Sequence, residues 1–179
     1  MSDIRTIMTA KEMARTLERL ASEVIERRGE EGPLVLVGIQ RRGVDLARRL
    51  KKLLDARLSS PAQFGMLDIN LYRDDWSNLG IAPTISHTDI PAGIEGASLI
   101  LVDDVLYSGR TTRAALEAIL DFGRPRRVEL LVLIDRGHRE LPIQADYVGK
   151  RVNTASHERV DVLVAEQDEQ DKVLLRAKA

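Results

Sequence analysis

The sequence contains no cysteine among its 179 residues, and aromatic side chains make up only 3% of it. The absence of cysteine excludes disulfide bonds, thiolate catalysis and cysteine-ligated zinc. The scarcity of aromatics argues against a broad stacking platform for single-stranded nucleic acid. The core must therefore be built from Val, Leu, Ile and Ala.

Positive and negative charges are nearly balanced in the sequence. It also contains no long apolar run. Lys and Arg number 27 against 28 Asp and Glu, a formal charge of -1. Any nucleic-acid site must therefore be a local patch. The apolar runs 34–39 and 130–134 are far shorter than the roughly 18 to 20 residues that span a bilayer. The first residues lack the apolar region of a signal peptide, which predicts a cytoplasmic protein.

What remains is typical of one globular domain covering residues 1–179, with 44% hydrophobic and 31% charged residues. A capping box at Thr9 and Glu12 predicts the start of a helix that Gly29 ends. The alternation of strands and helices predicts an α/β domain with a mainly parallel sheet flanked by helices, and ligands at the carboxyl ends of its strands. The expected strands are 34–39, 66–72, 98–102, 128–134 and 160–166, and further helices are expected over 44–54 and 111–122.

Residues 73–96 are rich in Asp, Ser, Asn, Gly, Pro and Thr and show no clear apolar period. Connections of this length are commonly lids or disordered segments. We expect a flexible lid or small hood insertion over 73–96; the alternative is a surface insertion without a role.

The segment LILVDDVLYSGRTT at 99–112 carries the clearest chemistry. An apolar strand brings Asp103 and Asp104 to its end, and Ser108 and Gly109 lead into the start of a helix. A helix N-terminus offers N–H groups and a positive dipole end to a phosphate. Adjacent carboxylates suit hydroxyl groups or a metal complex. Together they predict a ribose 5-phosphate site; the alternative is a solvated acid pair beside an ordinary helix cap.

This segment resembles the phosphoribosyl pyrophosphate (PRPP) motif of the type I phosphoribosyltransferases. Four further blocks resemble the PyrR family of pyrimidine operon regulators within that group: 38–43, 68–75, 135–142 and 145–150. The resemblance covers nearly the whole chain in order. It implies a type I phosphoribosyltransferase fold and the conversion of uracil and PRPP to UMP and diphosphate, with Mg²⁺ carried by PRPP. It also implies UMP-dependent binding of pyrimidine operon leader RNA, which attenuates transcription, and assembly as a homodimer or homotetramer.

The resemblance assigns roles to individual positions. Asp103, Asp104 and Arg136 would be catalytic, with Arg136 near the base and diphosphate. Residues 40–43 match a pyrophosphate loop that can contain a non-proline cis peptide. The PRPP and UMP ligands would contact Arg41, Arg42, Arg73, Asp103, Asp104, Val105, Leu106, Tyr107, Ser108, Gly109, Arg110, Thr111, Arg136 and, through its backbone, Val160. The histidines are too widely separated to predict a protein-ligated metal.

The leader RNA would contact a set of basic residues, namely Arg15, Arg19, Arg27, His138, Arg139 and Lys150. Arg15 and Arg19 are like charges one helical turn apart, which favours an anionic partner. Nearby glutamates leave open the alternative of a salt-bridged surface helix. Glu18 stands where relatives can carry Thr and Gln144 where Arg is common, and both changes remove favourable charge from this face.

Two other functions stay open at this stage. The chain could be a salvage phosphoribosyltransferase without RNA-binding activity. It could also act on a purine base, because the acid pair and phosphate loop contact the sugar phosphate and leave the base unspecified.

Overall fold

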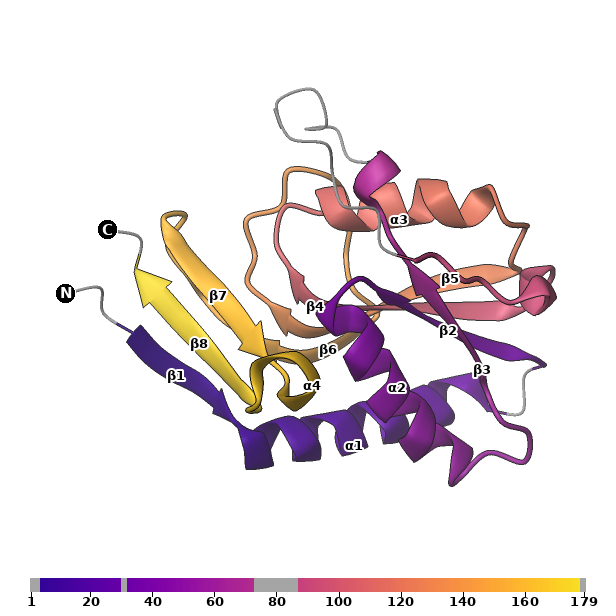
Figure 1. The fold of residues 1–179 in the computed structure, drawn as a ribbon, viewed down its shortest axis with the longest axis horizontal. Coiled ribbons are helices and arrows are strands. Elements are labelled where there is room, and N and C mark those ends of the chain that lie inside the picture. The colour runs from indigo at the N-terminus through magenta and orange to yellow at the C-terminus, as the bar shows by residue number, and fades with distance from the viewer. Residues whose placement is uncertain (1–3, 30–31, 73–86, 178–179) are drawn as a thin grey trace.

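The computed structural model describes residues 4–29, 32–72 and 87–177, and it is an α/β fold built on two sheets (Figure 1). The larger sheet has five strands in the order β3-β2-β4-β5-β6, and all of its pairings are parallel. Its strands are β2 (Leu34–Ile39), β3 (Gln63–Leu67), β4 (Ser98–Leu106), β5 (Arg127–Asp135) and β6 (Tyr147–Arg151). The predicted parallel α/β sheet is confirmed.

Helices cover both faces of this sheet. The helices α1 (Ala10–Arg28) and α2 (Arg42–Asp55) contribute to one apolar core with Leu34 and Leu36 of β2. The helix α3 (Arg110–Leu120) joins a second core with Val35 and Val37 on the opposite face. Successive residues of a strand point to opposite faces, so a strand covered on both sides needs the unbroken apolar run seen in the sequence. The predicted capping box of α1 is present, and Gly29 follows its last turn.

A second, antiparallel sheet has the order β1-β8-β7. It consists of β1 (Ile4–Thr9), β7 (Glu158–Leu163) and β8 (Lys172–Ala177), with the short helix α4 (Ala165–Asp168) between β7 and β8. Its apolar face joins the core beneath α1 through Met8, Val162 and Leu175. Of its three strands, only β7 overlaps a strand predicted from the sequence, that at 160–166.

Three predicted strands differ from the structure by more than one residue at an end, and the strand expected at 128–134 differs by one residue at each end. The strand expected at 66–72 is β3, which ends at Leu67, and Asn70–Tyr72 form a 3₁₀ helix. The strand expected at 98–102 continues to Leu106, so the acid pair lies inside β4. The strand expected at 160–166 ends at Leu163, and α4 follows because side chains of that segment bond to α2.

Part of the predicted lid, 73–86, lies outside the described residues. The remainder, 87–96, contains a β-bridge between Asp89 and Met66 and a 3₁₀ helix at Ala92–Ile94. A lid or hood over 73–96 stays a prediction. Among the described residues, no helix combines the length and apolar character needed to cross a membrane.

Candidate active site

The two acidic side chains of β4 lie at the carboxyl end of the parallel sheet. Asp103 is 7% exposed and Asp104 is half-buried. Asp103 accepts the N–H of Asp104 at 2.9 Å, and Asp104 accepts the N–H of Val105 at 2.8 Å. Burial, with the charge of Asp104, raises the pKa of Asp103 well above its usual range, and burial also raises the pKa of Asp104. A ligand that supplies hydroxyl donors or positive charge would relieve this cost of ionisation.

The turn after β4 prepares a second polar site. Gly109 has φ +92°, a conformation that favours glycine, and α3 begins at the next residue. Ser108 Oγ accepts the N–H of Arg110 at 3.3 Å, while the N-cap residue provides no side-chain cap to α3. The N–H groups of the first helical turn have no intrahelical acceptor, so this end of α3 fits a phosphate.

The segment after β5 wraps around this turn and sets its backbone conformation. The N–H of Arg136 donates to Leu106 O at 3.1 Å, and the N–H of Glu140 donates to Ser108 O at 2.9 Å. Arg139 Nη1 donates to Tyr107 O at 2.9 Å. Three successive carbonyl oxygens of the turn are therefore bonded to residues 136–140.

Arg136 itself is buried at 7% exposure beneath Tyr107. Its guanidinium carbon lies 4.1 Å from the Tyr107 ring centroid, a cation–π distance. Arg136 Nε donates to Thr154 Oγ1 and Nη2 donates to Ala155 O, both at 3.2 Å. These contacts hold Arg136 against the turn at 106–109.

A cleft of about 410 Å³ brings several predicted site residues together. Its lining includes Arg42 at the start of α2, Asp104, and Val160 with its neighbours in β7. The preceding Gln40–Arg41 peptide is cis, and Arg41 is exposed. A Cβ atom at Gly43 would lie 2.5 Å from the carbonyl oxygen of Val102, so glycine allows the start of α2 to lie directly against β4.

The residues expected to bind RNA fall into two groups. Arg19, Arg27 and Lys150 lie where α1 crosses the edge strand β6, and each donates to a backbone carbonyl, those of Gly149, Asp146 and Ile7 at 2.6, 2.7 and 2.7 Å. Arg15 is exposed on the same helix. His138 and Arg139 belong to the segment that wraps the phosphate-binding turn. Glu23 pairs with both Arg19 and Arg27, as the surface-helix alternative expects.

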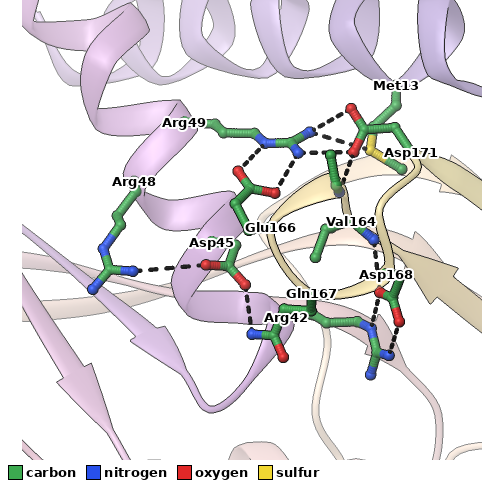
Figure 2. Close-up of polar contacts among 11 residues, drawn as sticks. Met13, Arg42, Asp45, Arg48, Arg49, Val164, Glu166, Gln167, Asp168 and Asp171 are labelled. Carbon is green, nitrogen blue, oxygen red and sulfur yellow. Dashed lines mark hydrogen bonds and ion pairs between the residues drawn. The ribbon is translucent and has the colours of Figure 1, made fainter.

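Sequence reasoning missed the acidic partner of Arg42. Asp168 accepts hydrogen bonds from Arg42 Nε at 3.0 Å and Nη2 at 2.8 Å, as Figure 2 shows. The run EQDEQD at 166–171 has no apolar period and looks like a solvated surface in the sequence. Arg73 lies outside the described residues. Across 4–29, 32–72 and 87–177, the structure holds no cluster of three His, Asp or Glu side chains arranged to bind a metal.

Comparisons with known proteins identify the family of the chain. Residues 3–167 match the model of the phosphoribosyl transferase domain. The chain is 51% identical over 170 residues to the "Bifunctional protein PyrR" of Thermus aquaticus, covering 94% of this chain and 93% of that protein. It is 52% identical over 161 residues to the protein of the same name from Pelotomaculum thermopropionicum, covering 90% and 89%.

The fold resembles solved purine phosphoribosyltransferases at low sequence identity. The hypoxanthine phosphoribosyltransferase of Trypanosoma cruzi has a TM-score of 0.71 at 17% identity, covering 98% of this chain and 97% of that one. The hypoxanthine-guanine phosphoribosyltransferase of Bacillus anthracis has a TM-score of 0.70 at 16% identity, covering 98% and 99%. These likenesses establish the fold, and the closer sequence relationships establish the family: the chain belongs to the phosphoribosyltransferases and, among them, to the PyrR proteins.

Proposed function

We propose that the protein transfers the phosphoribosyl group of PRPP to uracil, forming UMP and diphosphate. The observation that carries this proposal is the shared cleft of Arg42, Asp104 and Val160, with the phosphate-binding turn following from the same strand. Arg42 provides charge for the diphosphate, the acid pair meets the ribose, and β7 meets the base. The choice of uracil rests on membership of the PyrR family.

The chain's own residues account for binding and for stabilisation of the transition state. The start of α3 and the turn at 106–111 hold the 5-phosphate, while Asp103 and Asp104 accept hydrogen bonds from the ribose hydroxyls. As the diphosphate leaves, positive charge develops on the ribose, and the nearby carboxylates stabilise it. Arg41 and Arg42 bind the departing diphosphate, and we assign Arg73 to the same task.

The residues present also fit Mg²⁺ arriving with PRPP, because Asp103 and Asp104 place carboxylate oxygens, the ligands that Mg²⁺ takes, side by side in β4. When bound, Mg²⁺ supplies neutralisation of the diphosphate charge. Arg136 orders the phosphate-binding turn through its stacking on Tyr107 and its bond to Leu106.

The test is Asp104→Asn, assayed for UMP formation from uracil and PRPP. We expect kcat to fall about 100-fold, as is typical when one electrostatic contact to a transition state is removed. Circular dichroism should show an unchanged fold. Full activity in this variant would contradict the role of the acid pair. Wild-type activity with hypoxanthine or guanine in place of uracil would contradict the proposed base.

We also propose that the protein binds pyrimidine operon leader RNA, more tightly in the presence of UMP. The supporting observation is the exposed basic face of α1 beside Lys150. A groove of about 560 Å³ continues this face and is lined in part by Arg5, Lys150 and Arg151. Phosphate contacts of this kind give affinity that falls steeply with salt.

Titration with leader RNA, with and without UMP at two salt concentrations, tests this second activity. Arg19→Gln should weaken binding and lower the salt slope by about one unit, as loss of one phosphate contact predicts. Uracil turnover should not change. Arg124→Gln, on the turn after α3, is the control and should bind RNA as the wild type does. If Arg19→Gln binds RNA as tightly as the control variant and the wild type, then α1 is not part of the RNA-binding surface.

A further inference from the structure

Asp168 forms a two-point ion pair with Arg42, and the pair has a defined orientation (Figure 2). It engages Nε and Nη2, which form one edge of the planar guanidinium group. In the described part of the chain, the structure shows no hydrogen bond from Arg42 Nη1. An arginine has five N–H donors, so the remaining edge of this group can donate to an anion while Asp168 keeps the first edge.

Asp168 is fixed by contacts that do not involve Arg42. Its Oδ2 accepts the N–H of Val164 at 2.9 Å, and its own N–H donates to Val164 O at 2.7 Å. On the same segment, Arg49 of α2 pairs with Glu166 at 2.5 Å and with Asp171 at 2.8 Å. Figure 2 shows Arg49 extended between these two carboxylates. The carboxylate of Asp168 is therefore a rigid support, and Arg42 is the flexible partner.

The same contacts join two walls of the cleft. Gln167 Nε2 donates to Asp45 Oδ2 at 2.7 Å, which adds a further link between α4 and α2. The helix α4 begins two residues after β7 ends, and residues of β7 line the same cleft as Arg42. The position of the arginine is thereby fixed relative to Asp104 and to the strand proposed to meet the base.

We propose that Asp168 is a positioning residue for the diphosphate of PRPP, holding Arg42 with its second guanidinium edge turned toward the ligand. This inference rests on the proposed phosphoribosyltransferase activity. A free arginine side chain loses rotamer entropy when it is immobilised. The ion pair with Asp168 orders Arg42 in the folded protein before PRPP binds, so less side-chain entropy is lost on binding.

The opposite role would be competition, in which the carboxylate occupies Arg42 and PRPP must displace it. The two roles predict opposite changes for Asp168→Asn. Loss of positioning weakens PRPP binding, whereas loss of a competitor strengthens it. The independent anchoring of Asp168 and its use of a single guanidinium edge favour positioning.

The experiment measures PRPP binding by titration calorimetry with Mg²⁺, together with steady-state UMP formation. For Asp168→Asn we expect roughly tenfold increases in the Kd and KM for PRPP. We expect kcat and the KM for uracil to stay within about twofold of the wild type. The matched control is Glu169→Gln, the same type of change at the exposed neighbouring residue, which should leave all these constants unchanged.

A double-mutant cycle shows whether Asp168 acts through Arg42. In an Arg42→Lys background the two-point pair is already lost, so Asp168→Asn should add little further loss of PRPP affinity. Additive losses, or unchanged or tighter PRPP binding in Asp168→Asn, would overturn the positioning role. This comparison remains decisive if the single variant has a lower Tm. A wild-type protein that neither binds PRPP nor forms UMP would instead contradict the proposed function itself.

Discussion

At the scale of single residues, the acid pair represents a stability cost kept for function. Asp103 is buried beside a second carboxylate, and its pKa is raised because ionisation there is unfavourable. Such sites typically trade stability for activity. The hydrogen bond that Asp103 accepts from Asp104 N–H needs only an oxygen, so asparagine can preserve it.

We therefore predict that Asp103→Asn stabilises the ligand-free protein at pH 8 by about 1 kcal/mol, or roughly 2–4 °C in Tm. In the unfolded chain Asp103 ionises at its ordinary pKa, while the folded protein retains the proton to higher pH. The wild type is thus penalised above the raised pKa, and the penalty disappears as pH falls toward the ordinary value. Calorimetric Tm values from pH 8 to pH 4 should show the difference shrinking; a constant difference would contradict the raised pKa.

The basic residues of α1 have a structural task alongside the proposed RNA contact. The edge strand β6 leaves backbone carbonyls unpaired on its outer side; Arg19 donates to two of them, and Arg27 donates to Asp146 O just before the strand. Arg19 and Arg27 keep about half of their side-chain surface exposed, at 52% and 50%. One residue can therefore secure the sheet edge and still meet a phosphate with its other N–H groups.

At the scale of elements, the phosphate-binding turn depends on the segment 136–143 that wraps around it. Gly109 faces that segment, and a Cβ atom there would lie 3.2 Å from Ile143 Cβ. Gly96 offers a comparison, because it also has a positive φ, +69°. A Cβ atom added there would have no neighbouring side chain or backbone atom within 4 Å.

Gly109→Ala should lose about 1–2 kcal/mol of stability and most of its PRPP affinity. Gly96→Ala should lose a similar amount of stability, because alanine is also strained at a positive φ. It lies just before β4, away from the turn, and should bind PRPP with the affinity of the wild type. Urea unfolding gives the stability of both variants, and calorimetric titration with PRPP gives their affinity. Equal PRPP affinity in the two would show that the turn tolerates a side chain.

The contiguous elements of the site could be predicted from sequence. The run from Ser98 to the start of α3 carries its strand, acid pair, glycine and helix start within one short segment, so local rules suffice. The small antiparallel sheet could not be predicted in this way. Its strands are short and mix charged with apolar residues, and β1 pairs with β8 from the other end of the chain. Asp168 was missed for the same reason, because its partner Arg42 is 126 positions away.

At the scale of the whole molecule, Arg49 is a main link between the two sheets. It is 23% exposed and bonds to Glu166 within α4 and to Asp171 between α4 and β8 (Figure 2). Hydrogen bonds from Arg49, aided by its charge, lower the pKa of Glu166 and of Asp171, so the pairs contribute stability above the ordinary carboxyl pKa and lose it in acid.

Arg49→Leu should lower stability by about 1 kcal/mol at pH 7, with the loss shrinking below about pH 4. Hydrogen exchange should quicken in 158–177 and in β1 while the amides of the parallel sheet stay protected. Arg48→Leu is the matched control, since Arg48 is 55% exposed and makes a longer 3.7 Å pair with Asp45. Uniformly faster exchange in both sheets would show that they open as one unit.

The pairing of β1 with β8 places the two ends of the chain side by side (Figure 1). During translation β1 leaves the ribosome before β8, by on the order of ten seconds at bacterial elongation rates. The parallel sheet with its acid pair and phosphate turn can assemble in that interval, whereas the sheet containing β7 cannot close. A nascent chain is therefore expected to form the part proposed to hold the sugar phosphate before the sheet proposed to meet the base, and chains that end before β8 should bind PRPP without discriminating among bases.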